Sequence, residues 1–173
     1  MVLLAAERER LQCGEVMALT IRPAEPDDAE YVVAMIRALA RHDGEPNPGL
    51  TEEDFRRDGF GPKRDFWTLI AELDGQPVGC AAYNRAYSLE WAAQGCYLLD
   101  LYVDEIARRN GIGRALIEAV CKATRVHGGS FLAWSMARSN VEATAFYDKL
   151  GAQTHDVVFW TASGDLFAEL AEG

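Results

Sequence analysis

Residues 99–114 read LDLYVDEIARRNGIGR, and this stretch decides the fold. The apolar run 96–103 predicts a buried strand, and the apolar stripe along 111–127 predicts a helix. The turn between them holds two glycines and three donor side chains. Glycine lets a backbone approach an anion closely, and the free amides at a helix N-terminus attract negative charge. The pattern therefore predicts a pyrophosphate cradle, although it is neither a P-loop nor a G-x-G-x-x-G motif. The alternative is a glycine-rich turn with solvated arginines.

The rest of the chain predicts further strands and helices on both sides of this stretch. A Thr-Glu-Glu-Asp capping box opens a short helix, and Asp74-Gly75 forms a hairpin turn. The order of elements predicts one mixed α/β sheet, with an N-terminal extension at 1–17 and a single domain at 18–173. The further predicted strands are 19–21, 66–73, 78–87, 131–134 and 157–160, and the further predicted helices are 23–42, 51–59 and 140–150.

Composition and charge restrict the class of protein. The 173 residues are 49% apolar and 25% charged, which excludes a disordered or collagenous chain. The net charge of −10 disfavours nucleic acid as a partner and attracts cations. A cationic substrate such as a polyamine fits this charge, and a merely solubilising acidic surface is the alternative.

Neither a membrane span nor a metal site is predicted. No apolar stretch approaches the length needed to cross a bilayer, and the first residues do not form a signal peptide, so we expect a cytoplasmic protein. The three histidines are far apart in sequence, and the cysteines form no C-x-x-C pair. Three of the four cysteines, Cys80, Cys96 and Cys121, lie in apolar surroundings, and Cys13 does not. We therefore expect buried thiols rather than disulfides or metal ligands.

A second group of residues lies in the helix predicted at 140–150. Asn140 and Tyr147 are seven residues apart, so they share one face of that helix. Without further context, an N-cap and a core tyrosine explain this pair.

Together, these motifs resemble those of the GNAT superfamily of acetyl-CoA-dependent N-acetyltransferases. Its cofactor motif, Arg/Gln-x-x-Gly-x-Gly/Ala, matches residues 108–113, and its second block matches Asn140, 145–147 and 150–151. The resemblance spans about 19–170. It implies an α/β fold with a central, mostly antiparallel twisted sheet flanked by helices. It also implies splayed strands at the acetyl-CoA site and a homodimer.

A closer likeness is to the diamine (spermidine/spermine) acetyltransferase group and its thialysine-acetylating relatives. The matching runs are IRPA at 21–24, LTEED at 50–54, DGFG at 58–61 and YLLD at 97–100. This likeness implies a small cationic acceptor, a polyamine or a lysine-like amine. In the polyamine enzymes the position of Leu99 usually carries a glutamate that helps to remove the amine proton, a role that leucine cannot perform.

The resemblance implies roles for individual residues, with direct acetyl transfer to an amine in a ternary complex and no metal. The amine must first lose a proton, and a water held by Asp100 or by a backbone carbonyl is the expected acceptor. A structural acid that satisfies strand-end amides is the alternative for Asp100. Tyr147 would protonate the departing thiolate. The residues expected to bind acetyl-CoA are Leu101, Tyr102, Val103, Arg108, Arg109, Asn110, Gly111, Ile112, Gly113, Arg114, Asn140 and Tyr147.

Acceptor selection is expected at 43–61 and at the hairpin end 83–91. Tyr87 and Trp91 in that hairpin are candidates for stacking on an amine or for a dimer interface. A protein, peptide or aminoglycoside-like acceptor is an alternative, as is a non-catalytic acyl-CoA-binding module, which Leu99 favours and Tyr147 disfavours. Six acids could pair with a second ammonium, or could be ordinary surface and capping residues: Glu45, Glu52, Glu53, Asp54, Asp58 and Glu90.

Overall fold

The computed structural model describes residues 17–44 and 49–173. The predicted extension 1–17 therefore lies outside the described residues, apart from Met17, as does Glu45. The chain divides into two compact units, one up to Asn140 and one formed by Val141–Gly173, and each is described by itself.

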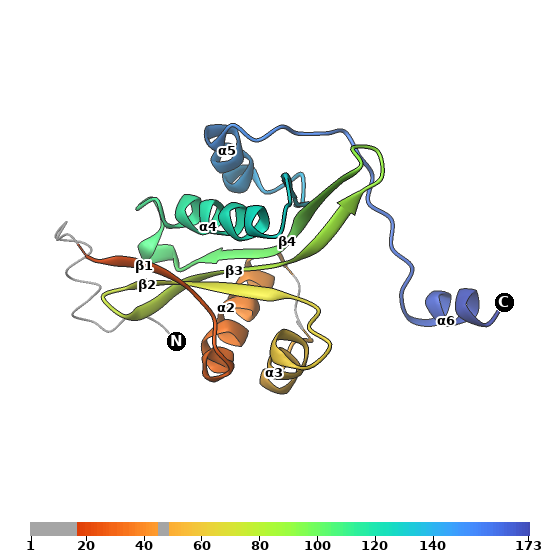
Figure 1. Cartoon of the computed structure of the whole chain (residues 1–173), viewed down its shortest axis with the longest axis horizontal. Helices are drawn as coiled ribbons and strands as arrows, with labels where there is room; N and C mark the ends of the chain where they lie inside the picture. The colour runs from red at the N-terminus through yellow and green to blue at the C-terminus, as the bar shows by residue number, and fades with distance from the viewer. Residues whose placement is uncertain (1–16, 45–48) are drawn as a thin grey trace. The chain divides into compact units, whose positions relative to one another are not determined.

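A five-stranded mixed sheet forms the centre of the first unit (Figure 1). The strands follow one another in the order of the sequence. Neighbours are antiparallel except for the last pair, which is parallel. The predicted fold class, a mostly antiparallel sheet flanked by helices, is confirmed. The strands are β1 (Leu19–Pro23), β2 (Trp67–Leu73), β3 (Gln76–Ser88), β4 (Ala93–Val103) and β5 (Phe131–Ala133).

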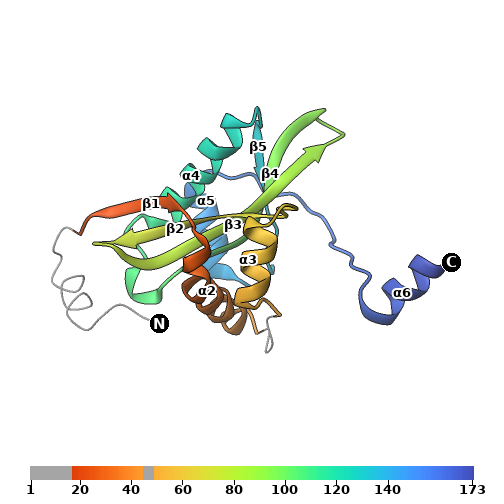
Figure 2. The ribbon, with the colours of Figure 1, turned by 60° about the horizontal axis from the view of Figure 1, so that its bottom comes forward.

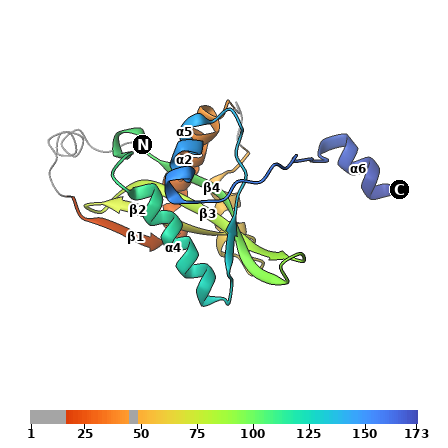
Figure 3. The same ribbon diagram turned by 90° about the horizontal axis from the view of Figure 1, so that it is seen from above.

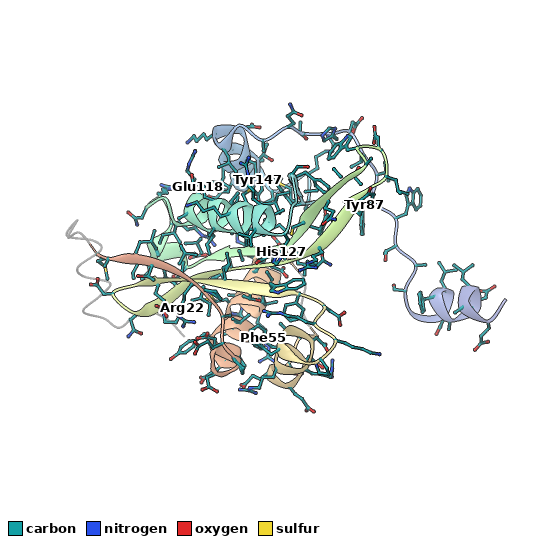
Figure 4. All side chains as sticks on the ribbon, viewed as in Figure 1. Arg22, Phe55, Tyr87, Glu118, His127 and Tyr147 are labelled. Carbon is teal, nitrogen blue, oxygen red and sulfur yellow. The ribbon has the colours of Figure 1, made fainter. Side chains whose placement is uncertain are left out.

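Helices cover both faces of this sheet (Figures 1 and 3). On one face lies α4 (Ile112–Val126), and its apolar stripe enters the larger core cluster with Ile112, Leu116 and Val120. The other face is covered by α2 (Ala29–His42) and α3 (Glu52–Phe60), where Phe55 is fully buried (Figure 4). Two short 3-10 turns, η1 (Pro26–Asp28) and η2 (Glu105–Ala107), precede α2 and α4.

Local sequence signals explain several boundaries. The predicted capping box forms, because the Thr51 hydroxyl accepts from the Asp54 amide and the Asp54 carboxylate accepts from the Thr51 amide. The hairpin between β2 and β3 turns at Asp74 and Gly75, which both have positive φ angles. These two signals act within a few residues, so the sequence alone predicted them.

The second unit contains α5 (Val141–Leu150) and α6 (Gly164–Glu172). The strand predicted at 157–160 is wrong, because those residues pair with no strand of the described chain. Their side chains are 72–86% exposed. An apolar run becomes a strand only when a neighbouring strand satisfies its backbone groups, and the run itself does not contain that neighbour. The helix α6 was not predicted.

The described cysteines are all free, and two of the three are buried as expected, Cys80 and Cys96. Cys121 is exposed, so its predicted burial is wrong. It lies on α4 outside the buried stripe that Leu116, Val120 and Thr124 form. Residues next to one another in sequence lie on different faces of a helix, so apolar neighbours do not show that Cys121 itself is buried. Among the described residues, no cluster of Asp, Glu, His and Cys side chains could hold a metal ion. No helix in this part of the chain is long and apolar enough to cross a membrane.

Candidate active site

The edge of β4 opens where β5 leaves it. The two strands pair only between Gly95–Tyr97 and Phe131–Ala133, whereas β4 continues to Val103 (Figure 2). No strand of the described chain pairs with this edge over residues 98–103. An open edge presents amides and carbonyls that can bind an extended ligand as an added strand.

A β-bulge bends β4 at the start of this open edge. Tyr83 lies opposite Leu98 and Ala82 lies opposite Asp100, so Leu99 is the extra residue between them. Leu98 packs in the core beneath α4, whereas Leu99 is 43% exposed. The bulge therefore places an exposed side chain at the point where the sheet opens.

Asp100 follows the bulge on the face of the sheet covered by α2. Burial raises the pKa of the Asp100 carboxyl, and the charge of Asp43 at the end of α2 raises it further. A carboxylate with a raised pKa is a stronger proton acceptor than an ordinary aspartate. Asp43 was not singled out in the sequence analysis, because only the packing of α2 on β4 brings it near Asp100.

The turn after β4 leads into α4 through two residues with positive φ angles. Arg109 has φ 67° and Gly111, the N-cap of α4, has φ 77°. The Asn110 amide group donates to the carbonyls of Ala107 and Arg108 at 3.2 and 3.3 Å, which holds the turn in place. The first turn of α4 contains no acid. Its free amides and the helix dipole therefore make this end of α4 suitable for an anion.

The three arginines of this region have different surroundings. The Arg108 guanidinium donates to the Val103 carbonyl at 3.1 Å, so it joins the turn to the end of β4. Arg114 pairs with Glu118 on the surface of α4, at 2.8 Å, and this pair offsets part of its charge (Figure 4). Arg109 is exposed beside the N-terminus of α4.

The first unit thus brings together the predicted residues on β4 and in the turn, from Asp100 to Arg114. Asn140 directly precedes α5. Tyr147 lies on α5 in the second unit, where burial raises the pKa of its hydroxyl to about 12. Tyr147 therefore keeps its proton throughout the physiological pH range, as an unshifted tyrosine also does, and has the protonation state of a general acid.

Three of the acids predicted to bind the acceptor form ion pairs with nearby arginines of α3. Glu52 pairs with Arg56, and Arg57 pairs with both Asp54 and Asp58. These pairs favour the interpretation as surface and capping residues. In the β3–β4 hairpin, Tyr87 is exposed (Figure 4). Trp91 is also exposed, and its ring lies edge-on to that of Phe131, with 5.3 Å between the ring centroids.

Comparison with known proteins identifies the family to which the chain belongs. The pattern of the Acetyltransferase (GNAT) family matches residues 32–152. The chain belongs to the GNAT acetyltransferase family. GNAT enzymes transfer acyl groups and use acetyl-CoA as the cosubstrate, and the open β4 edge followed by an acid-free helix N-terminus is a place that such a ligand fits.

Individual relatives of this GNAT enzyme act on amino acids. A thialysine N-epsilon-acetyltransferase of Sus scrofa is 32% identical over 145 residues, which cover 79% of this chain and 85% of that protein. An L-ornithine N5-acetyltransferase of Arabidopsis thaliana is 39% identical over 104 residues, 60% of this chain and 42% of that protein. Among solved structures, an integron cassette protein from the mobile metagenome of V. cholerae has a TM-score of 0.75 at 21% identity, covering 91% of this chain and 100% of that one. It supports the fold alone.

Proposed function

We propose that this GNAT enzyme transfers an acetyl group from acetyl-CoA directly to a primary amine of a small cationic acceptor in a ternary complex. One observation carries the proposal: the open edge of β4 holds Asp100 and leads directly into the anion-binding turn of α4. When bound, acetyl-CoA supplies an activated thioester. The open edge and the turn follow one another along the chain, as an extended cosubstrate with a phosphate-bearing end would require.

The residues of β4 and the turn would hold the cosubstrate. The amides of Leu101 and Val103 would bind its extended arm along the open edge and stabilise negative charge that develops on the carbonyl oxygen. The amides of residues 109–114 and the side chain of Arg109 would bind the pyrophosphate, with Arg108 bracing the turn. Asn140 would hydrogen-bond the arm.

Asp100 would accept the proton of the amine, directly or through a water. An alkylamine with a pKa of about 10.4 is neutral in only about one molecule in 2,500 at pH 7, so an acceptor is needed. The partial burial of Asp100 and its raised pKa support this role. Tyr147 would return a proton to the departing thiolate, because its hydroxyl stays protonated to about pH 12.

Thiol release from acetyl-CoA tests the proposal across spermidine, thialysine, lysine, an aminoglycoside and a peptide. We expect turnover on thialysine, lysine or spermidine, and loss of that turnover in Asp100→Asn but not in the matched surface variant Asp27→Asn. Turnover confined to the aminoglycoside or the peptide would contradict the acceptor class. Binding of acetyl-CoA with no thiol release on any amine would support a non-catalytic module instead.

We also propose a homodimer, which the second unit supports. Seven large apolar side chains between residues 157 and 170 of this unit are at least half exposed in the single chain, more than a monomer usually presents in one segment. A second copy would cover them, and light scattering would then give twice the chain mass. A location in the cytoplasm remains a prediction. The seven residues are Val157, Val158, Phe159, Trp160, Leu166, Phe167 and Leu170.

A further inference from the structure

A cavity of about 490 Å³ lies between α2 and the end of β4, outside the surface assigned above to acetyl-CoA. Apolar side chains line part of it, among them Met35 and Ile106, and Tyr102 lines it as well. The volume is within the range of small-molecule sites in proteins.

Four charged residues divide the lining of this cavity into a cationic and an anionic side. Arg37 and Arg41 are one turn apart on the same face of α2, and Asp104 and Glu105 follow β4. Within residues 17–44 and 49–173, no ion pair joins these arginines to these acids.

This arrangement differs from that of four other arginines of the chain, which bind carboxylates. Arg22 binds two of them, and Arg56, Arg57 and Arg114 are also paired. In the cavity, opposite charges line the same space without neutralising each other. Such a space is complementary to a ligand that carries both charges.

We propose that this cavity binds the zwitterionic head of an α-amino acid, with the carboxylate on Arg37 and Arg41 and the ammonium on Asp104 and Glu105. Arginine is the residue best suited to bind a carboxylate through two parallel hydrogen bonds. One oxygen of Asp104 accepts from the Ile106 amide at 3.3 Å, and the other oxygen would accept from the ammonium.

The position of the cavity relative to Asp100 deepens the proposed function, on which this step rests. Asp100 and Tyr102 are two residues apart on β4 and lie on the same face of the sheet, opposite Ala82 and Cys80. Two residues of a strand span about 6.6 Å. The four-methylene side chain of lysine is of comparable length, so an amino acid whose Cα lies beside Tyr102 would direct its side-chain amine toward Asp100, which itself lies outside the lining of the cavity.

The cavity therefore selects a diamino acid over a polyamine. A polyamine has no carboxylate for Arg37 and Arg41, and its ammonium groups would meet two guanidinium groups of the same charge. The side chain of Tyr102 lines the cavity, while its backbone remains on the open edge of β4 that would bind acetyl-CoA.

Three acceptors that share the distal amine test this assignment: lysine, cadaverine, which lacks the carboxylate, and 6-aminohexanoate, which lacks the α-ammonium. Charged hydrogen bonds contribute about 1.5–3 kcal/mol each, so we expect the KM of lysine to be roughly 10- to 100-fold below those of the other two. The variant Arg37→Gln with Arg41→Gln should raise the KM of lysine by the same factor and should not raise that of cadaverine, which loses only a repulsion.

A second double variant tests the acidic side of the cavity. Asp104→Asn with Glu105→Gln should raise the KM of lysine and leave that of 6-aminohexanoate unchanged, and asparagine retains an acceptor for the Ile106 amide. The control is Arg56→Gln, which removes an exposed arginine of α3. If a double variant fails to fold, Arg41→Gln alone is used, because Arg41 is exposed near the end of α2.

Calorimetric binding of lysine without acetyl-CoA separates this inference from the proposed function. Lysine binding that is lost in both double variants, without any acetyl transfer, would support the cavity site and overturn the proposed function. Acetyl transfer with the same lysine-to-cadaverine KM ratio in wild type and the arginine variant would overturn the cavity site alone. Absence of lysine binding to the wild-type protein would also overturn it.

Discussion

Gly111 is the N-cap of α4 and has φ 77°, so its replacement by alanine tests how the cradle is held. A β-carbon built at this position has no atom of the described chain within 4 Å. A steric clash therefore contributes nothing, and the whole effect of Gly111→Ala comes from the left-handed backbone conformation. Outside glycine, this conformation costs about 1–2 kcal/mol.

The conformational cost of Gly111→Ala can appear either as lost stability or as lost affinity for acetyl-CoA. If the turn keeps its conformation, the free energy of unfolding falls by about 1–2 kcal/mol and the affinity for acetyl-CoA stays the same. If the turn relaxes, stability is kept and the dissociation constant of acetyl-CoA rises about 5- to 30-fold, since the amides at Gly111 and Ile112 leave their positions. In either case the two losses sum to about 1–2 kcal/mol.

Urea unfolding and calorimetric binding of acetyl-CoA measure the two losses on the same preparations. Gly111→Asn serves as the control, because asparagine tolerates the left-handed region and should recover a large part of the loss. A combined loss above about 4 kcal/mol would refute the reasoning, since the open space at Gly111 leaves no clash to account for it. Wild-type values for both quantities in Gly111→Ala would refute it equally.

Three further substitutions test other parts of the structure. Arg22 donates to both carboxylate oxygens of Asp28 at 2.7 and 2.8 Å, and these hydrogen bonds are the largest cause of the lowered pKa of that carboxyl (Figure 4). A lowered pKa in the folded state stabilises the fold above the ordinary aspartate range, and this stabilisation is lost as pH falls. Arg22→Met should therefore destabilise the protein by about 2–4 kcal/mol at pH 7 and by less at pH 3; an equal loss at both pH values would contradict this. Asp100→Asn should lower kcat by about 100- to 10,000-fold and remove the acid limb of the pH profile of kcat. Adding Leu99→Glu, one residue away, should restore part of the rate. An intact acid limb in the single variant would mean that Asp100 has a structural role. Tyr147→Phe should lower kcat by about 100-fold and leave the calorimetric Kd of acetyl-CoA unchanged; wild-type turnover would remove Tyr147 from the acid role.

Most of the fold could be predicted because its signals are local. The capping box at Thr51, the turn at Asp74-Gly75 and the apolar stripe of α4 each act within a few residues of sequence. The strand, the glycine turn and the helix N-terminus on which the predicted cradle rests were found in the same way, since they follow one another along 96–113, and phosphate binding there remains a prediction.

The errors arose where the outcome depends on what a segment contacts. The apolar run 157–160 has the composition of a strand, yet it pairs with none in the described chain. Cys121 has apolar neighbours in sequence and is nevertheless exposed, because the packing of α4 decides which face is buried.

The sequence by itself determined the family, most of the order of elements, and the strand, turn and helix N-terminus on which the predicted anion site rests, because these depend on residue types and spacing along the chain. The tertiary structure alone decided the bulge at Leu99, the approach of Asp43 to Asp100, and the cavity that Arg37 shares with Asp104. The approach of Asp43 and the cavity join segments more than fifty residues apart, whereas the bulge lies between two consecutive strands, β3 and β4. All three features arise from the register of β4 and from the side of the sheet that α2 covers, and no local pattern contains either.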